Sequence, residues 1–137
     1  METVLVATDG SEYAETATDV ALDRAAARGA KLHVICVVDS RRVEEPALGS
    51  AELTTVYAED HARECVSDVR ERAADRGLSV ESTVRRGIPH EVILDYADEV
   101  DADIIVVGAH GDHGEHFSGV GQEVRESSEQ KVVVVSE

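Results

Sequence analysis

The sequence has few aromatic residues, few cysteines and few positive charges. Aromatic residues make up 3% of the chain, and tryptophan is absent. The hydrophobic share is nevertheless 42%, which is ordinary for a globular protein. Because alanine and valine carry much of that share, we expect a core built from small and β-branched side chains.

Basic residues are scarce relative to acidic ones. The 137 residues include 13 basic and 29 acidic ones, which gives a net charge of −16. The resulting field repels nucleic-acid phosphates and anionic membrane surfaces, so we expect neither as a partner. The acids are spread over all the predicted helices. This pattern is typical of a halophilic surface, where a salt-rich cytoplasm screens their mutual repulsion.

Cysteine usage and apolar runs indicate the compartment. Cys36 falls in a predicted strand and Cys65 in a predicted helix, without a C-x-x-C pattern, and no apolar leader precedes Val4. We therefore expect no disulfide, no zinc site and no secretion. The longest apolar runs are far shorter than a membrane span. The sequence predicts a soluble, cytoplasmic protein with one domain over residues 1–137.

The stretch from residue 103 to residue 121 combines an apolar run with an open loop. Residues 104–107 are all apolar and β-branched, which indicates a buried strand. The loop that follows contains Gly108, Gly111, Gly114, Gly119 and Gly121. Glycines let a backbone approach a ligand closely, and the next helix offers its positive end to an anion. Since open α/β sheets bind ligands at the carboxyl ends of their strands, this loop is a candidate binding site.

Apolar strands alternate with amphipathic helices along the chain. Strands are predicted over residues 3–8, 30–38, 78–85, 103–107 and 131–136, and helices over 12–28, 52–76, 89–100 and 120–128. Helical crossovers demand parallel strands covered on both faces. We therefore predict an α/β fold, a doubly wound sheet of five parallel strands. The period-two alternation of residues 78–85 favours an edge strand, followed by a turn at residues 86–89.

Three segments resemble the universal stress protein family, and the likeness covers essentially the whole chain. They read VLVATDGSEYAE, LHVICVVD and RRGIPHEVILDYADEVDADIIVVGAHG. The family's nucleotide motif is G-x2-G-x9-G-(S/T); Gly108, Gly111 and Gly121 stand at that spacing, with Gln122 at the fourth position. The resemblance implies an adenine nucleotide alpha hydrolase-like fold with strand order 3-2-1-4-5. It also implies a regulatory protein of the stress response.

The resemblance further implies an adenine nucleotide, ATP or AMP, bound at the tips of the first and fourth strands. The implied binding residues are Asp9, Val37, Gly108, Gly111, Gly121 and Gln122. Asp9 would hydrogen-bond the base or ribose, and Val37 would present its backbone to the adenine. The glycines and Gln122 would line the ribose and phosphates. Asp112 and Glu115 would repel a triphosphate unless Mg²⁺ bridged them.

Histidine and serine side chains raise two further chemistries, metal binding and hydrolysis. His110, His113 and His116 are imidazoles of the type that binds zinc, nickel or copper. A glycine-rich loop does not hold three ligands in fixed geometry, so solvated side chains are the preferred interpretation and no metal site is assigned. No serine has a motif coupling it to a histidine and an acid. We therefore assign no catalytic residue and expect any ATP hydrolysis to be slow.

The last predicted strand favours self-association. Four consecutive valines within residues 131–136 would leave an apolar edge open to pairing, and in the family this strand pairs antiparallel with its twin. A homodimer through the C-terminal strand is therefore expected, with regulatory protein partners unidentified.

The alternatives to a nucleotide-binding regulator are a dimeric partner-docking protein without nucleotide and, third, a slow ATP hydrolase or phosphotransferase.

Overall fold

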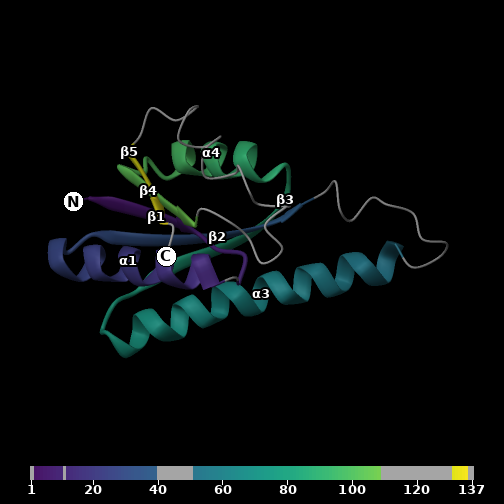
Figure 1. Cartoon of the computed structure of the whole chain (residues 1–137), viewed down its shortest axis with the longest axis horizontal. Coiled ribbons are helices and arrows are strands. Elements are labelled where there is room, and N and C mark those ends of the chain that lie inside the picture. The colour runs from purple at the N-terminus through teal and green to yellow at the C-terminus, as the bar shows by residue number, and fades with distance from the viewer. Residues whose placement is uncertain (1, 11, 40–50, 109–130, 136–137) are drawn as a thin grey trace.

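The computed structural model describes residues 2–10, 12–39, 51–108 and 131–135. Its elements are β1 (Thr3–Ala7), α1 (Glu12–Arg28), β2 (Lys31–Asp39), α3 (Ala51–Asp75), β3 (Val80–Gly87), α4 (Pro89–Glu99), β4 (Ile104–Gly108) and β5 (Lys131–Val135). The strands form one five-stranded sheet in the order β3-β2-β1-β4-β5 (Figure 1). All four neighbouring pairs are parallel. The predicted fold class and strand order are confirmed, while the helix predicted at 120–128 lies outside the described residues.

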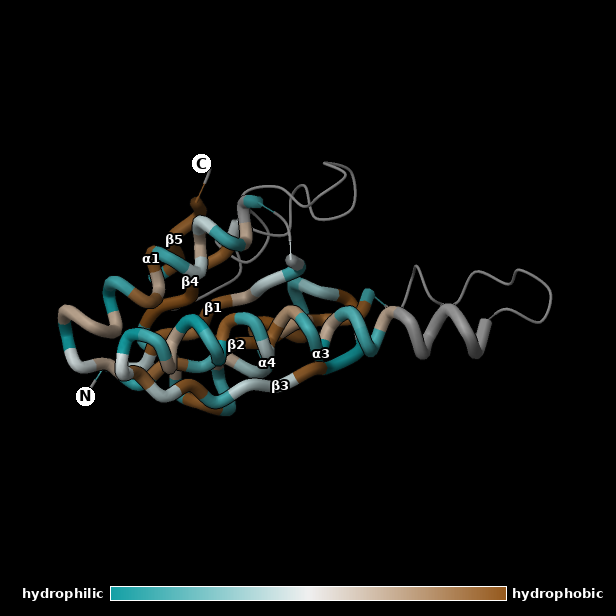
Figure 2. Tube along the Cα trace, turned by 90° about the horizontal axis from the view of Figure 1, so that it is seen from below, coloured by the Kyte–Doolittle hydropathy of each residue, from teal (hydrophilic) through white to brown (hydrophobic). Residues whose placement is uncertain are grey.

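Helices cover both faces of the sheet (Figure 1). One core cluster joins α1 and α3 to the sheet, and a second joins α4 to the opposite face. Along β1, Val4 and Val6 belong to the first cluster and Leu5 to the second, and none of the three is exposed. Apolar residues therefore run along the strands between helices whose outer sides are hydrophilic (Figure 2). This arrangement explains why the central strands lack polar alternation.

Helix α1 packs against the sheet through a face of small residues. Its alanines at positions 14, 17, 21 and 25 are all buried. Gly29 adopts φ 63°, and the Ala30 N–H donates to the Ala25 carbonyl oxygen at 3.1 Å, which ends the helix. Gly77 adopts φ 73° and ends α3 in the same manner. The helices predicted over residues 12–28 and 52–76 therefore end at residue 28 and within one residue of residue 76.

Strand β3 ends two residues later in the chain than the sequence indicated. The predicted turn over residues 86–89 is wrong in its first half, because β3 continues through Gly87. The reason is that β2 is long enough to provide partners, since Val38 pairs with Arg86 and Asp39 with Gly87. The predicted edge position of β3 is confirmed. Within the described part of the chain, no helix is long and apolar enough to cross a membrane.

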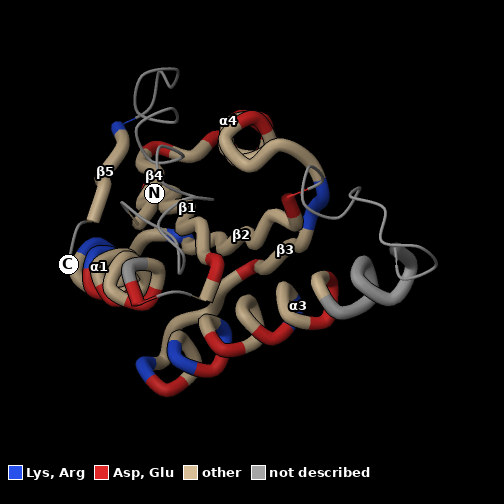
Figure 3. Tube along the Cα trace, turned by 45° about the vertical axis from the view of Figure 1, so that its right-hand side comes forward, with Lys and Arg blue, Asp and Glu red and all other residues tan. Residues whose placement is uncertain are grey.

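Acidic residues recur along the helices, most visibly along α3 (Figure 3). Two ion pairs join α3 to α1, Arg72 with Asp19 and Arg76 with Asp23. Exposed pairs of this kind contribute about 0–1 kcal/mol each, and salt weakens them. Salt also weakens the repulsion among the remaining acids, and this change stabilises the fold. Because the net charge is −16, we expect repulsion to prevail over these few pairs.

We predict that the melting temperature falls when KCl is lowered from molar to dilute concentration. The Debye length grows from about 3 Å at 1 M to about 10 Å at 0.1 M salt, so more acidic pairs repel one another. Calorimetry at a series of KCl concentrations measures the slope. The variant Glu71→Gln/Asp75→Asn removes two exposed acids from α3 and should show a shallower slope. A melting temperature independent of salt would contradict a halophilic surface.

Candidate functional site

The carboxyl ends of β1, β2 and β4 meet at one edge of the sheet (Figure 1). Val6 of β1 pairs with Val106 of β4, so the two strands end at the same level, with Gly108 two residues beyond the pair. Ala7 pairs with Ile35 of β2. Asp9 and Val37 each follow two residues after this second pair. Three of the predicted binding residues, Asp9, Val37 and Gly108, are therefore brought to the same edge.

The other predicted residues of the nucleotide motif lie outside the described residues. These are Gly111, Gly121 and Gln122, together with the loop histidines His110, His113 and His116. The structure thus places half of the predicted binding set and leaves the phosphate end of the motif as a prediction.

The strands β1 and β4 mark the point where the chain changes direction within the sheet. β1 lies between β2 and β4. The crossover helix α1, which follows β1, packs on one face, whereas α4, which leads into β4, packs on the other. Where the strand order reverses, as it does between β1 and β4, a crevice opens outside the carboxyl ends of the strands, and α/β sheets bind ligands there. Asp9 and Gly108 flank this position.

Val37 lies on a part of β2 that extends past the end of β1. The register between the two strands stops at Ile35, whereas β2 continues to Asp39. The Val37 side chain is 7% exposed and packs in the α4 cluster, and its neighbour Cys36 packs in the α1 and α3 cluster. The side chain of Val37 is therefore occupied by the core. Only its backbone is left to face a ligand.

The tip of β1 is held against β2 and α3. The Thr8 N–H donates to the Ile35 carbonyl oxygen at 3.0 Å, and the Gly10 N–H donates to Thr8 Oγ1 at 3.2 Å. Gly10 adopts φ 82°, and a Cβ at this position would lie 2.9 Å from Cys65 Sγ. Glycine is therefore required here twice, by the backbone conformation and by the close approach of α3.

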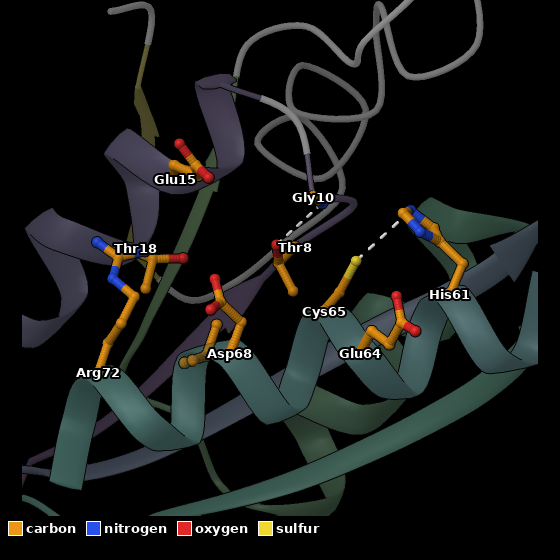
Figure 4. A pocket seen from close by; sticks show the side chains of 10 residues that line it. Thr8, Gly10, Glu15, Thr18, His61, Glu64, Cys65, Asp68 and Arg72 are labelled. Atoms are coloured by element: carbon orange, nitrogen blue, oxygen red, sulfur yellow. Dashed lines mark hydrogen bonds between the residues drawn. The ribbon is translucent and has the colours of Figure 1, made fainter.

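A cavity of about 300 Å³ lies beneath this tip. Its lining residues come from the tip of β1, from α1 and from α3, and they are Thr8, Gly10, Glu15, Thr18, His61, Glu64, Cys65, Asp68, Val69 and Arg72 (Figure 4). Three of these side chains are carboxylates and only Arg72 is a strong base. A bare anion would therefore gain little from entering this cavity.

His61 and Cys65 lie one helical turn apart on α3 and face the tip of β1 (Figure 4). The His61 Nε2 atom lies 3.4 Å from the Asp9 carbonyl oxygen and 3.5 Å from Cys65 Sγ, so an N–H at this position can donate to either. A hydrogen bond from Cys36 lowers the pKa of Cys65, and nearby His61 lowers it further, against opposing effects of burial, Asp9 and Asp68. The same hydrogen bond and burial raise the pKa of Cys36.

Sequence reasoning missed this group of side chains. Its one local signal was the i, i+4 spacing of His61 and Cys65 on a predicted helix. Cys36 lies 29 positions before Cys65 in the chain, and only the packing of α3 on β2 brings them together. Among the described residues, no group of three histidine, cysteine or acidic side chains is arranged to hold a metal ion.

Comparisons with known proteins agree with the fold. The model of the universal stress protein family matches residues 1–136. The chain belongs to the universal stress protein family. A family member from Methanocaldococcus jannaschii, universal stress protein MJ0531, is 31% identical over 112 residues, which are 81% of this chain and 66% of that protein. The matched region thus spans just under two thirds of that curated relative.

Solved structures extend the likeness within the family. The protein MJ0577 superposes with a TM-score of 0.84 at 26% identity, covering 99% of this chain and 96% of that one. A universal stress protein solved in complex with cAMP is 28% identical, with a TM-score of 0.68 and coverage of 98% and 97%. A family member from Archaeoglobus fulgidus, solved with dAMP, is 24% identical with a TM-score of 0.72, covering 99% of this chain and 98% of that one, which shows the fold alone.

We predict that Gly10→Ala destabilises this family member more than Gly29→Ala does. Both glycines have positive φ, but a Cβ at Gly29 meets nothing within 4 Å, whereas one at Gly10 meets Cys65. Strain is common to both variants, and crowding adds about 1–3 kcal/mol at Gly10. Urea unfolding in molar KCl measures both free energies of unfolding. Equal losses would mean that α3 does not press against the tip of β1.

Proposed function

We propose that this chain binds an adenine nucleotide at the carboxyl ends of β1 and β4 and acts as a regulatory protein in a stress response. The proposal depends above all on one observation. Asp9, Val37 and Gly108 meet at the carboxyl ends of the strands, where the strand order reverses between β1 and β4. It is supported by the 28% identical universal stress protein that was solved with cAMP. Recognition of the nucleoside would use groups that this chain retains.

Each of the three residues has a role suited to its chemistry. The Asp9 carboxylate accepts hydrogen bonds from ribose hydroxyls or from the adenine amino group. Val37 offers backbone groups beyond the end of β1, and Gly108, which has no side chain, lets the β4 backbone approach the ribose. Gly111, Gly121 and Gln122 continue the binding surface to the phosphates in the manner of the family motif.

The phosphate end discriminates among adenine nucleotides. Asp112 and Glu115 stand in the loop after β4, and carboxylates of α1 and α3 line the nearby cavity. These charges oppose a triphosphate more than a monophosphate, and a divalent cation offsets the repulsion. We therefore propose AMP or ATP as ligand, with Mg²⁺ accompanying ATP.

We predict that Asp9→Ala weakens AMP binding about tenfold or more, because a desolvated hydrogen bond to a charged group is worth about 1.5–3 kcal/mol. Isothermal titration with adenosine, AMP and ATP, each with and without Mg²⁺, measures the affinities. The matched control is Asp75→Ala, an exposed acid at the far end of α3, which should leave them unchanged. Mg²⁺ should strengthen ATP binding but not adenosine binding.

Absence of heat for all three ligands at millimolar concentration would contradict nucleotide binding and favour the partner-docking alternative. Turnover of ATP above that of the Asp9→Ala variant would instead favour the hydrolase or phosphotransferase alternative, since a pure regulator releases its ligand unchanged.

Self-association is the second part of the proposed function. β5 lies at the edge of the sheet, and its four valines are only half-buried. Val133 and Val135 pack against the α1 side and Val132 and Val134 against the α4 side. A strand that is apolar on both faces and unpaired along one side is suited to pairing with a second copy. We propose a homodimer joined through β5, which leaves the nucleotide edge accessible to other proteins.

We predict a particle of twice the 14.7 kDa chain mass in light scattering at molar KCl. Val134→Lys in β5 should convert it to a monomer, because two copies would bring the introduced charges together. The matched control is Val84→Lys, which changes a half-buried valine of the opposite edge strand β3. It should lose comparable stability yet remain dimeric. Monomeric behaviour of the unaltered chain would contradict the proposal.

A further inference from the structure

The two cysteines of the chain meet between β2 and α3, beside the tip of β1. Cys36 is 4% exposed and Cys65 8% exposed, and both are free thiols in the same core cluster. The two thiols act on each other, since Cys65 raises the pKa of Cys36 and Cys36 lowers the pKa of Cys65. A disulfide requires two side chains placed together, and here Cys36 on β2 and Cys65 on α3 belong to one buried cluster without a C-x-x-C motif.

Cys65 is reachable by a small molecule. It lines the cavity of about 300 Å³, together with Gly10 and His61, whereas Cys36 is not among the described lining residues. Figure 4 shows Cys65 and His61 pointing toward the tip of β1. One cysteine therefore meets solutes that enter the cavity, and the other lies behind it against the sheet.

The charges around the pair distinguish the two thiols. His61 lies 3.5 Å from Cys65 Sγ and can stabilise a thiolate there. Asp9 acts against ionisation of both cysteines, and Asp68 against that of Cys65. The hydrogen bond from Cys36 favours the thiolate of Cys65 and disfavours that of Cys36. Cys65 is therefore the more nucleophilic member of the pair, and Cys36 retains its proton.

We propose that Cys65 and Cys36 form a hydroperoxide-reactive pair, in which Cys65 attacks the peroxide and Cys36 closes an intramolecular disulfide. The inference is independent of nucleotide binding. Its geometric basis is the access of Cys65 through the cavity, the contact of Cys65 with His61 and the burial of Cys36 in the same core cluster.

The first step oxidises one sulfur. The Cys65 thiolate attacks one oxygen of the hydroperoxide, the O–O bond breaks, and an S–O bond forms. Sulfur loses two electrons to the peroxide, and the leaving hydroxide or alkoxide takes a proton from solvent. The product is a sulfenic acid at Cys65.

The second step resolves that acid. The Cys36 sulfur attacks Cys65 Sγ, the S–O bond breaks, and the S–S bond forms. The hydroxide leaves with the Cys36 proton as water. In total, two thiols and one hydrogen peroxide become one disulfide and two waters, so the only co-reactant is the peroxide. The disulfide would join β2 to α3 directly below Gly10.

The test uses the full, reduced chain in molar KCl with hydrogen peroxide as the probe. We expect the intact mass to fall by two hydrogen atoms and both thiols to disappear. Tryptic peptides 32–41 and 64–70, which contain Cys36 and Cys65, should be recovered as one cross-linked species from single chains. A disulfide only between chains, or oxidation without this cross-link, would overturn the proposal.

Single variants separate the two roles. Cys36→Ser should leave a sulfenic acid in peptide 64–70 that dimedone captures, whereas Cys65→Ser should leave Cys36 unmodified at the same peroxide concentration. His61→Gln should slow oxidation about fivefold and move the midpoint of its rate against pH upward, since less thiolate remains. His90→Gln, on α4, is the matched control and should change neither. Oxidation of Cys36 in Cys65→Ser, or an unmoved pH midpoint in His61→Gln, would overturn the assigned roles.

Discussion

A parallel sheet has to be covered on both faces, and the rest of this molecule follows from that constraint. The crossovers between parallel strands are helices, so the central strands must be apolar on both sides. Val4, Leu5 and Val6 satisfy this in β1, with none of their surface exposed. Burying one such side chain contributes about 1.5–3 kcal/mol. The middle of β1 therefore has no room for polar side chains, and its first ionisable neighbour, Asp9, follows the end of the strand.

Polar chemistry next to β1 begins at the carboxyl end of the strand. Asp9 is the first ionisable residue after the apolar run, and it follows β1 at the point where the strand order reverses between β1 and β4. Gly10 allows the chain to turn with positive φ while α3 presses against it. A larger residue at position 10 would move α3 outward and with it His61 and Cys65. Packing and chemistry are thus coupled through one residue without a side chain.

Much of the fold was predictable because its signals are local. Short segments of the sequence are enough to identify the alternation of strands and helices. The same holds for the alanines of α1 and for the glycines that follow α1 and α3. Asp9 and Gly108 were placed at strand ends for the same reason. The carboxyl end of β3 was not predictable locally, since Gly87 joins the strand only because β2 offers Asp39 as a partner. The thiol pair was missed because Cys36 and Cys65 meet through the docking of α3 on β2.

The proposed nucleotide and thiol sites share one electrostatic field. The Asp9 carboxylate opposes ionisation of Cys36 and of Cys65. A ligand that hydrogen-bonds Asp9 disperses that charge and so favours the Cys65 thiolate, whereas phosphates nearby add negative charge and disfavour it. These two effects are reciprocal. A bound anion raises the free energy of forming the Cys65 thiolate, and the thiolate weakens the binding of that anion by the same free energy. A neutral nucleoside therefore favours ionisation of Cys65, whereas a triphosphate without a cation disfavours it. A divalent cation on the phosphates reduces the difference between these two effects on Cys65.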